Sequence, residues 1–274
     1  MSNHNKDQSS NENKKAMIEI RDLWKSYGKL QVLKGLSLNI IEGETLVILG
    51  QSGVGKSVLL RQIIGLEVPD KGTVLIKGKT VEELLKQKGQ DTLKMGMLFQ
   101  GSALFDSMSV GDNTAFYLKQ HEAHLSEKEV KDRVAHALKL VNMANTETKM
   151  PSDLSGGMRK RAALARLIVY RPSIILYDEP TTGLDPITAN QINELINATQ
   201  NELKATSIVV THDIRSALEV GDRLAFHFDG KISHIANKDD FFKIEDPNIQ
   251  SFLENSAVAS MTAIFQKEKE EKGS

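Results

Sequence analysis

Residues 45–57 read TLVILGQSGVGKS and predict the centre of the fold. The run Thr45–Leu49 is apolar and rich in β-branched side chains, which is typical of a buried strand. A glycine-rich turn follows it, and Lys56–Gly65 then predicts a helix. The turn fits the phosphate-loop pattern G-x-x-x-x-G-K-[ST] in the strand–loop–helix context that this pattern requires. The sequence therefore predicts a phosphate site at the end of this strand, rather than a glycine-rich turn that matches by chance.

The residue types of this loop suit a phosphate group. Glycines let backbone N–H groups curl toward phosphate oxygens, and the helix N-terminus adds a partial positive charge. We expect Lys56 to pair with the β- and γ-phosphates of a nucleotide and Ser57 to ligate Mg²⁺. The predicted nucleotide contacts of this segment are Gly50, Gln51, Ser52, Gly53, Val54, Gly55, Lys56, Ser57 and Val58.

A second apolar run, Ser173–Tyr177, ends in the acidic residues Asp178 and Glu179. Ligands of α/β sheets bind where strands end, so these carboxylates are placed to meet a nucleotide. We expect Asp178 to hold Mg²⁺ through water and Glu179 to polarise the attacking water. An acidic pair alone is commonly a solvated loop, but together with the phosphate loop it predicts a site for Mg-ATP.

Composition bounds the class of protein. The chain has 274 residues, of which 40% are hydrophobic and 26% charged, enough for one large α/β domain. A formal net charge of −1 provides no basic field for nucleic acid, so we expect no nucleic-acid partner. The absence of cysteine excludes disulfides, thiolate metal sites and cysteine nucleophiles. No apolar run is long enough to span a bilayer, and the polar N-terminus lacks a signal-peptide core, so we expect a cytoplasmic protein.

The remaining pattern predicts the organisation of the chain. Strands of a mostly antiparallel layer are expected at Ile18–Asp22, Leu36–Ile40, Thr45–Leu49 and Thr73–Ile76. Later strands, Ser173–Tyr177 and Ser207–Thr211, flank a helix at Ile187–Leu203, which favours a parallel sheet with crossover helices. Further helices are expected at Glu127–Val141 and Met158–Tyr170, the first within a helical insertion over Leu104–Pro151.

Three segments follow from this pattern: a disordered N-terminal segment (1–15), an ATPase domain (16–245) with a helical subdomain at about 104–165, and a C-terminal extension (246–274) with a disordered end from Lys267. Within the extension, apolar spacing over Asn248–Phe265 predicts an amphipathic helix. Such a helix could pack on a neighbouring subunit or on its own domain, and the pattern leaves both open.

The segment Leu154–Met158 reads LSGGM and resembles the signature motif of the ABC ATPase family, which other phosphate-loop ATPases lack. The resemblance extends over about Ile18–Gly230. It implies a phosphate-loop NTPase core with a parallel sheet, an antiparallel β subdomain and a helical insertion. It also implies that Ser155, Gly156 and Gly157 cap the γ-phosphate of ATP held by the other subunit of a head-to-tail homodimer.

Further positions match the family in order. The resemblance implies that Tyr27 stacks on adenine, that Gln100 links Mg²⁺ to a transmembrane partner, and that Asp185, in the loop 182–185, contacts the opposite subunit. The resemblance also implies that His212 contacts the γ-phosphate. The implied catalytic residues are therefore Glu179, His212 and Lys56. The implied metal ligands are Ser57, Gln100 and Asp178. Two positions depart from the common pattern, Met158 for glutamine and Val58 for a second hydroxyl residue, and we expect activity to survive both.

Three stretches are similar to the ATPase subunit of Mla-type lipid transporters: residues 154–167 (LSGGMRKRAALARL), 96–113 (GMLFQGSALFDSMSVGDN) and 178–189 (DEPTTGLDPITA). This likeness implies a complex of two ATPases, two membrane permeases and an MCE-type lipid-binding protein that moves phospholipids between inner and outer membranes. The alternatives are an importer of a small solute such as an amino acid, a soluble ATPase acting on DNA or ribosomes, and a non-hydrolysing regulatory subunit. The intact site argues against the last of these.

Overall fold

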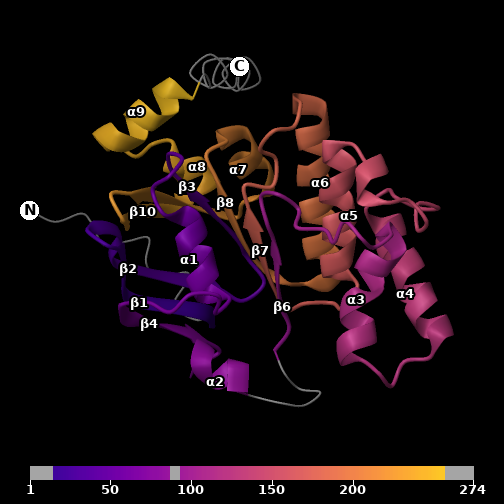
Figure 1. The fold of residues 1–274 in the computed structure, drawn as a ribbon. Helices are drawn as coiled ribbons and strands as arrows, with labels where there is room; N and C mark the ends of the chain where they lie inside the picture. Colours follow the sequence, from indigo (N-terminus) through magenta and orange to yellow (C-terminus); the bar gives the residue numbers. More distant parts are fainter. Residues whose placement is uncertain (1–14, 87–92, 257–274) are drawn as a thin grey trace, which may run out of the picture.

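The computed structural model describes residues 15–86 and 93–256, which form two β-sheets and the helices around them (Figure 1). One sheet is antiparallel and the other mainly parallel, with helices on both of its faces. This arrangement confirms the predicted α/β class. Among the described residues, no helix is long and apolar enough to cross a membrane.

The antiparallel sheet has the strand order β2-β1-β4-β5. Its strands are β1 (Ala16–Tyr27), β2 (Leu30–Ile41), β4 (Lys71–Ile76) and β5 (Lys79–Thr80), and the short helix α2 (Val81–Lys86) follows them. Strands β1 and β2 are longer than their predicted cores. The reason is a register shift between Ile20 and Leu23, which interrupts the alternation of apolar and polar side chains that marks a strand in sequence.

The second sheet has six strands in the order β10-β9-β3-β8-β7-β6. They are β3 (Thr45–Leu49), β6 (Met95–Leu98), β7 (Ile174–Asp178), β8 (Thr206–Thr211), β9 (Arg223–Phe228) and β10 (Lys231–Asn237). All neighbours pair in parallel except β9 and β10.

The assignment of Thr45–Leu49 to the antiparallel layer was therefore wrong. Strand β3 lies near the middle of the parallel sheet, between β8 and β9. Its two faces belong to different cores: Leu46 and Ile48 pack with the antiparallel sheet, whereas Val47 and Leu49 pack with the helices. A strand covered on both faces is apolar throughout, which is the composition of central parallel strands.

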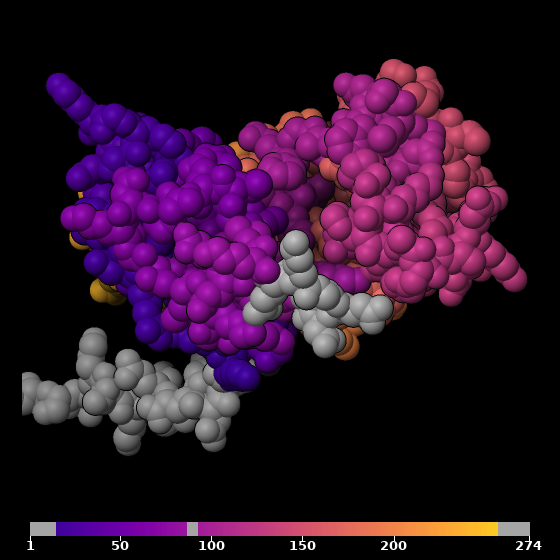
Figure 2. Space-filling model, turned by 60° about the horizontal axis from the view of Figure 1, so that its bottom comes forward, coloured from indigo at the N-terminus to yellow at the C-terminus, as the bar shows by residue number. Residues whose placement is uncertain are grey.

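Helices cover both faces of this sheet (Figure 1). Helix α1 (Lys56–Ile63) packs on the side of the antiparallel sheet, and α6 (Pro186–Leu203) and α7 (Ile214–Val220) on the other. The segment between β6 and β7 contributes α3 (Val110–His121), α4 (Glu127–Leu140), a 3₁₀ turn (Pro151–Asp153) and α5 (Gly156–Ile168). Figure 2 shows the antiparallel sheet, in indigo and violet, and this helical segment, in magenta, as lobes on opposite sides of the molecule.

Serine and aspartate caps explain where the functional helices begin. Ser109 and Ser126 accept hydrogen bonds from the first turns of α3 and α4, and Ser126 forms a full capping box with Glu129. Ser155 caps α5 in the same way. Asp185 caps α6, whose first residue is Pro186. The signature segment thus contains the cap of α5, and the loop 182–185 ends in the cap of α6.

The C-terminal part of the described chain returns to its own domain. After α8 (Lys238–Phe241), helix α9 (Pro247–Asn255) buries Ile249 and Phe252, and the Phe252 ring lies 5.3 Å from that of Phe226. The helix predicted over Asn248–Phe265 could pack on a neighbouring subunit or on its own domain. Its described part, within α9, packs on its own domain. Residues 257–274, like 1–14 of the predicted N-terminal tail, lie outside the described residues.

Candidate functional site

The phosphate loop connects the end of β3 to the start of α1. Gly55 has a left-handed φ of 105°, and a Cβ atom there would lie 2.5 Å from Val32 Cγ1, so only glycine fits. Lys56 is 4% exposed, and its ammonium donates to the carbonyl oxygens of Gly50 (2.7 Å) and Gln51 (2.8 Å). Burial lowers the pKa of Lys56, and the negative charges of Glu179 and Asp178 oppose this shift.

The end of strand β7 lies beside the start of α1. Ser57 Oγ donates to Asp178 Oδ1 at 2.7 Å. Burial raises the pKa of Asp178, the hydrogen bond from Ser57 lowers it, and the neighbouring charge of Glu179 raises it further. A hydroxyl and a carboxylate that meet in this way provide the hard oxygen ligands that Mg²⁺ takes, so the residues present fit the predicted metal.

Glu179 is held from several directions. Its Oε1 lies 3.4 Å from Lys56 Nζ, while its Oε2 accepts from Thr182 Oγ1 (3.1 Å) and lies 2.9 Å from His212 Nδ1. Its backbone N–H donates to the Val210 carbonyl on β8. The residue has a left-handed φ of 47°, which costs a non-glycine residue about 1–2 kcal/mol. These contacts fix the carboxylate in spite of that cost.

A cavity of about 280 Å³ is lined by half of the predicted site residues. Its lining residues are Val32, Ser52, Gly53, Gly55, Lys56, Ser57, Val58, Gln100, Glu179, Thr182 and His212. Sequence reasoning did not include Val32 in the site, because β2 approaches the loop only in the folded chain. Thr182 stood in a recognised loop, but nothing in the sequence indicated its hydrogen bond to Glu179.

The loop after Gln100 depends on helix α5. Ser102 and Ala103 have left-handed φ values of 66° and 49°, which are unfavourable for both residue types. Arg166 donates to their carbonyl oxygens at 3.2 and 2.8 Å, and its guanidinium lies 5.5 Å from the centre of the Phe105 ring. One arginine therefore fixes the turn that presents Gln100 to the cavity.

Other predicted site residues lie outside this cavity. Tyr27, at the end of β1, is 45% exposed and donates its hydroxyl to Glu67. Ser155 accepts from the Met158 N–H, and Gly157 packs so closely on Thr188 that a Cβ atom would lie 2.5 Å from its Cγ2. Asp185 accepts from the N–H groups of Ile187 and Thr188. The structure places these residues on elements next to the site, and their roles stay predictions.

The sequence matches known proteins over most of its length. Residues 33–182 match the family model described as ABC transporter. The chain is 36% identical over 242 residues to the intermembrane phospholipid transport system ATP-binding protein MlaF of Haemophilus influenzae, covering 88% of this chain and 91% of that protein. It is 37% identical over 242 residues to the methionine import ATP-binding protein MetN of Clostridium tetani, covering 87% and 74%.

A solved structure extends this likeness to an enzyme after turnover. The dimeric, post-hydrolysis state of the ATP-binding cassette MJ0796 bound to ADP and Pi superposes with a TM-score of 0.72, at 31% identity, over 81% of this chain and 99% of that one. The phosphate loop, the acidic pair and the signature segment lie within the matched family model. This chain belongs to the ABC transporter family, as an ATP-binding subunit that hydrolyses ATP.

Proposed function

We propose that this chain powers a transporter that moves phospholipids between the inner and outer membranes of a cell envelope. The observation that supports phospholipid as the transported substrate is the 36% identity of this chain to the phospholipid transport protein MlaF, over 91% of that protein. The three stretches that are similar to Mla-type ATPases include the signature segment, the Gln100 segment and the loop after Glu179.

ATP binding begins with the phosphate loop. Backbone N–H groups of the loop and the N-terminus of α1 receive the phosphates. Lys56 exchanges its two carbonyl partners, Gly50 and Gln51, for phosphate oxygens, which are better partners for a buried ammonium. Ser57, Asp178 and Gln100 would hold Mg²⁺, which when bound neutralises charge that builds on the phosphate oxygens.

Hydrolysis depends on Glu179. Its carboxylate orients the water that attacks the γ-phosphate and accepts a proton from that water. Thr182 and His212, which contact its Oε2, keep that oxygen directed into the cavity. His212 and Lys56 then face the charge that develops on the transferring group, since both line the same cavity.

Two copies of the chain are needed for a complete site. Ser155, Gly156 and Asp185 are exposed and lie outside the cavity of their own chain. We assign them, with Gly157, to the ATP bound by the partner in a head-to-tail homodimer with composite sites. In that arrangement Ser155 exchanges its hydrogen bond from Met158 for one with the γ-phosphate, and Tyr27 stacks on the adenine of its own chain.

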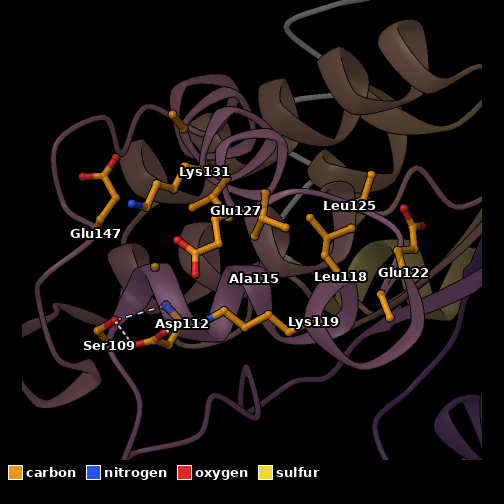
Figure 3. A pocket seen from close by; sticks show the side chains of 15 residues that line it. Ser109, Asp112, Ala115, Leu118, Lys119, Glu122, Leu125, Glu127, Lys131 and Glu147 are labelled. Carbon is orange, nitrogen blue, oxygen red and sulfur yellow. Dashed lines mark hydrogen bonds and ion pairs between the residues drawn. The ribbon is translucent and has the colours of Figure 1, made fainter.

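A groove between α3 and α4 suits the permease. It encloses about 910 Å³, and its floor includes Leu118, Val130 and Val134. Charged side chains of both signs rim it, among them Asp112, Lys119, Glu127, Lys131 and Glu147 (Figure 3). An apolar floor with a charged rim fits an amphipathic segment of a membrane protein. Each of two permeases would dock one segment there, holding the ATPase at the cytoplasmic face of the inner membrane, with an MCE-type protein beyond them.

An importer of a small solute is the second candidate, because the similarity to the methionine import protein MetN is equally high. The two functions share the ATPase site and differ in the partner beyond the permease. A lipid transporter requires a lipid-binding partner, whereas a solute importer requires a solute-binding protein.

The test is affinity purification of the tagged chain from its native membranes in mild detergent, with identification of the recovered proteins and lipids. Recovery of a permease, an MCE-type protein and phospholipid supports lipid transport, whereas a permease with a solute-binding protein supports import. Lys131→Glu reverses a charge on the groove and should reduce permease recovery. Lys128→Glu makes the same change on α4 outside the groove and should not. Equal recovery with both variants would remove the groove from the proposal.

A further inference from the structure

Lys160 is a buried cation close to two loops of the nucleotide site. It lies in the second turn of α5 and is 5% exposed. Its ammonium donates to two backbone carbonyl oxygens, that of Gln100 at 2.5 Å and that of Glu179 at 3.5 Å. One side chain thus reaches both loops that present polar residues to the nucleotide cavity.

We propose that Lys160 is a positioning residue for ATP hydrolysis, which sets the Glu179 backbone and the Gln100 loop at a fixed separation. The proposal rests on the proposed roles of Glu179 and Gln100. Lys160 itself does not line the cavity, so it acts through these two residues.

Packing alone does not account for a lysine here. Neighbouring residues of α5 that are equally buried are apolar, including Ala162, Ala163 and Leu164. A buried ammonium loses its hydration, at a cost of several kcal/mol unless polar groups replace the water. Within the described ranges no carboxylate oxygen lies within 4.0 Å of Lys160, so its direct partners are the two carbonyls. Burial lowers the pKa of Lys160, and the charges of Asp178 and Glu179 oppose this shift.

The two carbonyls belong to strained or irregular backbone. Glu179 has a left-handed φ of 47°, and the turn two residues after Gln100 is left-handed at Ser102 and Ala103. Unfavourable backbone of this kind persists where the surroundings hold it. Arg166 holds the turn but does not contact Glu179, whereas Lys160 contacts both segments. Without Lys160, the backbone at Glu179 and the loop at Gln100 could therefore shift relative to each other. A shift of about 1 Å at a catalytic group can cost on the order of 100-fold in rate.

The experiment compares steady-state ATP hydrolysis of the full chain with that of Lys160→Met, which keeps the length of the side chain and removes its donors. We expect kcat to fall by at least about tenfold while KM for ATP changes by less than about threefold, because the phosphate contacts are intact. Lys160→Arg restores a charged donor and should recover most of the lost kcat. Lys128→Met, an exposed lysine on α4, is the matched control and should match the wild type.

The outcomes separate this inference from the proposed function. Wild-type kcat in Lys160→Met overturns the inference, and so does a loss that Lys160→Arg does not reduce. A rise in KM equal to the fall in kcat also overturns it, because that pattern indicates a damaged fold or binding site. If Lys160→Met does not fold, Lys160→Gln retains a neutral donor and is judged by the same split between kcat and KM. Wild-type turnover by Glu179→Gln would instead remove the catalytic role on which the inference rests.

Discussion

Lys56 Nζ lies 3.4 Å from Glu179 Oε1, so the lysine of the phosphate loop and the acid at the end of β7 form an ion pair inside the cavity. The two side chains are 4% and 10% exposed, and water screens their charges little. In the mechanism that we propose, the phosphate groups of a nucleotide compete with Glu179 for Lys56, so that nucleotide binding weakens this pair and frees the carboxylate to act on water. The ion pair would then connect phosphate binding to the availability of the acid.

Glu179→Gln is expected to lower kcat for ATP hydrolysis by at least about 100-fold, since a neutral amide cannot accept the proton of the attacking water. ATP affinity should hold or increase, because the amide no longer competes with phosphate for Lys56. We also expect the variant to remain in a closed, ATP-bound dimer, which sedimentation with ATP would detect. The exposed Glu194→Gln on α6 is the matched control. Wild-type turnover by Glu179→Gln would refute the assigned role.

The site was predictable to the extent that its chemistry is local. The phosphate loop lies between a strand and a helix that adjoin it in sequence, and the acidic pair follows its strand directly. Lys56 and Ser57 were therefore predicted from the phosphate-loop pattern, and Glu179 from the acidic pair taken together with that loop. Asp185 and Ser155 were recognised by family resemblance, and within one chain they lie away from the cavity.

The neighbours of each element were harder to predict. Within Thr45–Leu49, the apolar run Leu46–Leu49 indicates a buried strand but not which strands pair with it, so its sheet was assigned wrongly. Contacts between distant segments leave no periodic pattern, which is why Val32 beside Gly55 and Lys160 beneath Glu179 could not be found from sequence. The left-handed turn at Ser102 and Ala103 was equally hidden, because neither residue type favours that conformation.

Gly50→Ala is expected to lower the free energy of unfolding by about 1–3 kcal/mol, as overpacking of a tight contact does. A Cβ atom at Gly50 would lie 2.5 Å from the backbone carbonyl oxygen of His227 on β9, which cannot rotate away. Urea denaturation measures the change, and ATP affinity should fall with it because the loop must shift. Gly101→Ala is the control, since a Cβ atom there meets no atom of the described residues within 4 Å. Equal loss in both variants would contradict the explanation.

Gln62→Leu is expected to raise the free energy of unfolding by about 1–3 kcal/mol, the cost of leaving a buried polar group without a partner. Gln62 lies in α1 and is 1% exposed, and neither its Oε1 nor its Nε2 has a hydrogen-bond partner in the described part of the chain. The measurement is the urea midpoint at an unchanged m-value. Gln200→Leu removes an amide that does donate, to the Gly43 carbonyl at 3.0 Å, and should not stabilise. A lower midpoint for Gln62→Leu would count against the prediction.

His227 should make the stability of the fold depend on pH. Burial, with a further contribution from the positive charge of Lys56, lowers the pKa of this imidazole from 6.5 to about 4. Between these values the unfolded chain binds a proton that the folded chain does not, so the free energy of unfolding falls as the pH falls from 6.5 toward 4. Over this window His227 accounts for a loss of about 3 kcal/mol in the free energy of unfolding, at about 1.4 kcal/mol per pH unit. Above pH 6.5 this loss is absent.

His227→Leu is expected to remove this pH-dependent loss, because leucine has no ionisable group. The variant should also stabilise the fold at every pH, because neither ring nitrogen of His227 has a hydrogen-bond partner among the described residues. Urea denaturation at pH 7.5 and at about pH 5 should therefore give a smaller pH-dependent loss for the variant than for the wild type. Gln62→Leu is the matched control: it also removes buried unpaired polar atoms but no ionisable group, so it should stabilise equally at both values. An unchanged loss in His227→Leu would mean that this imidazole does not stay neutral in the folded chain.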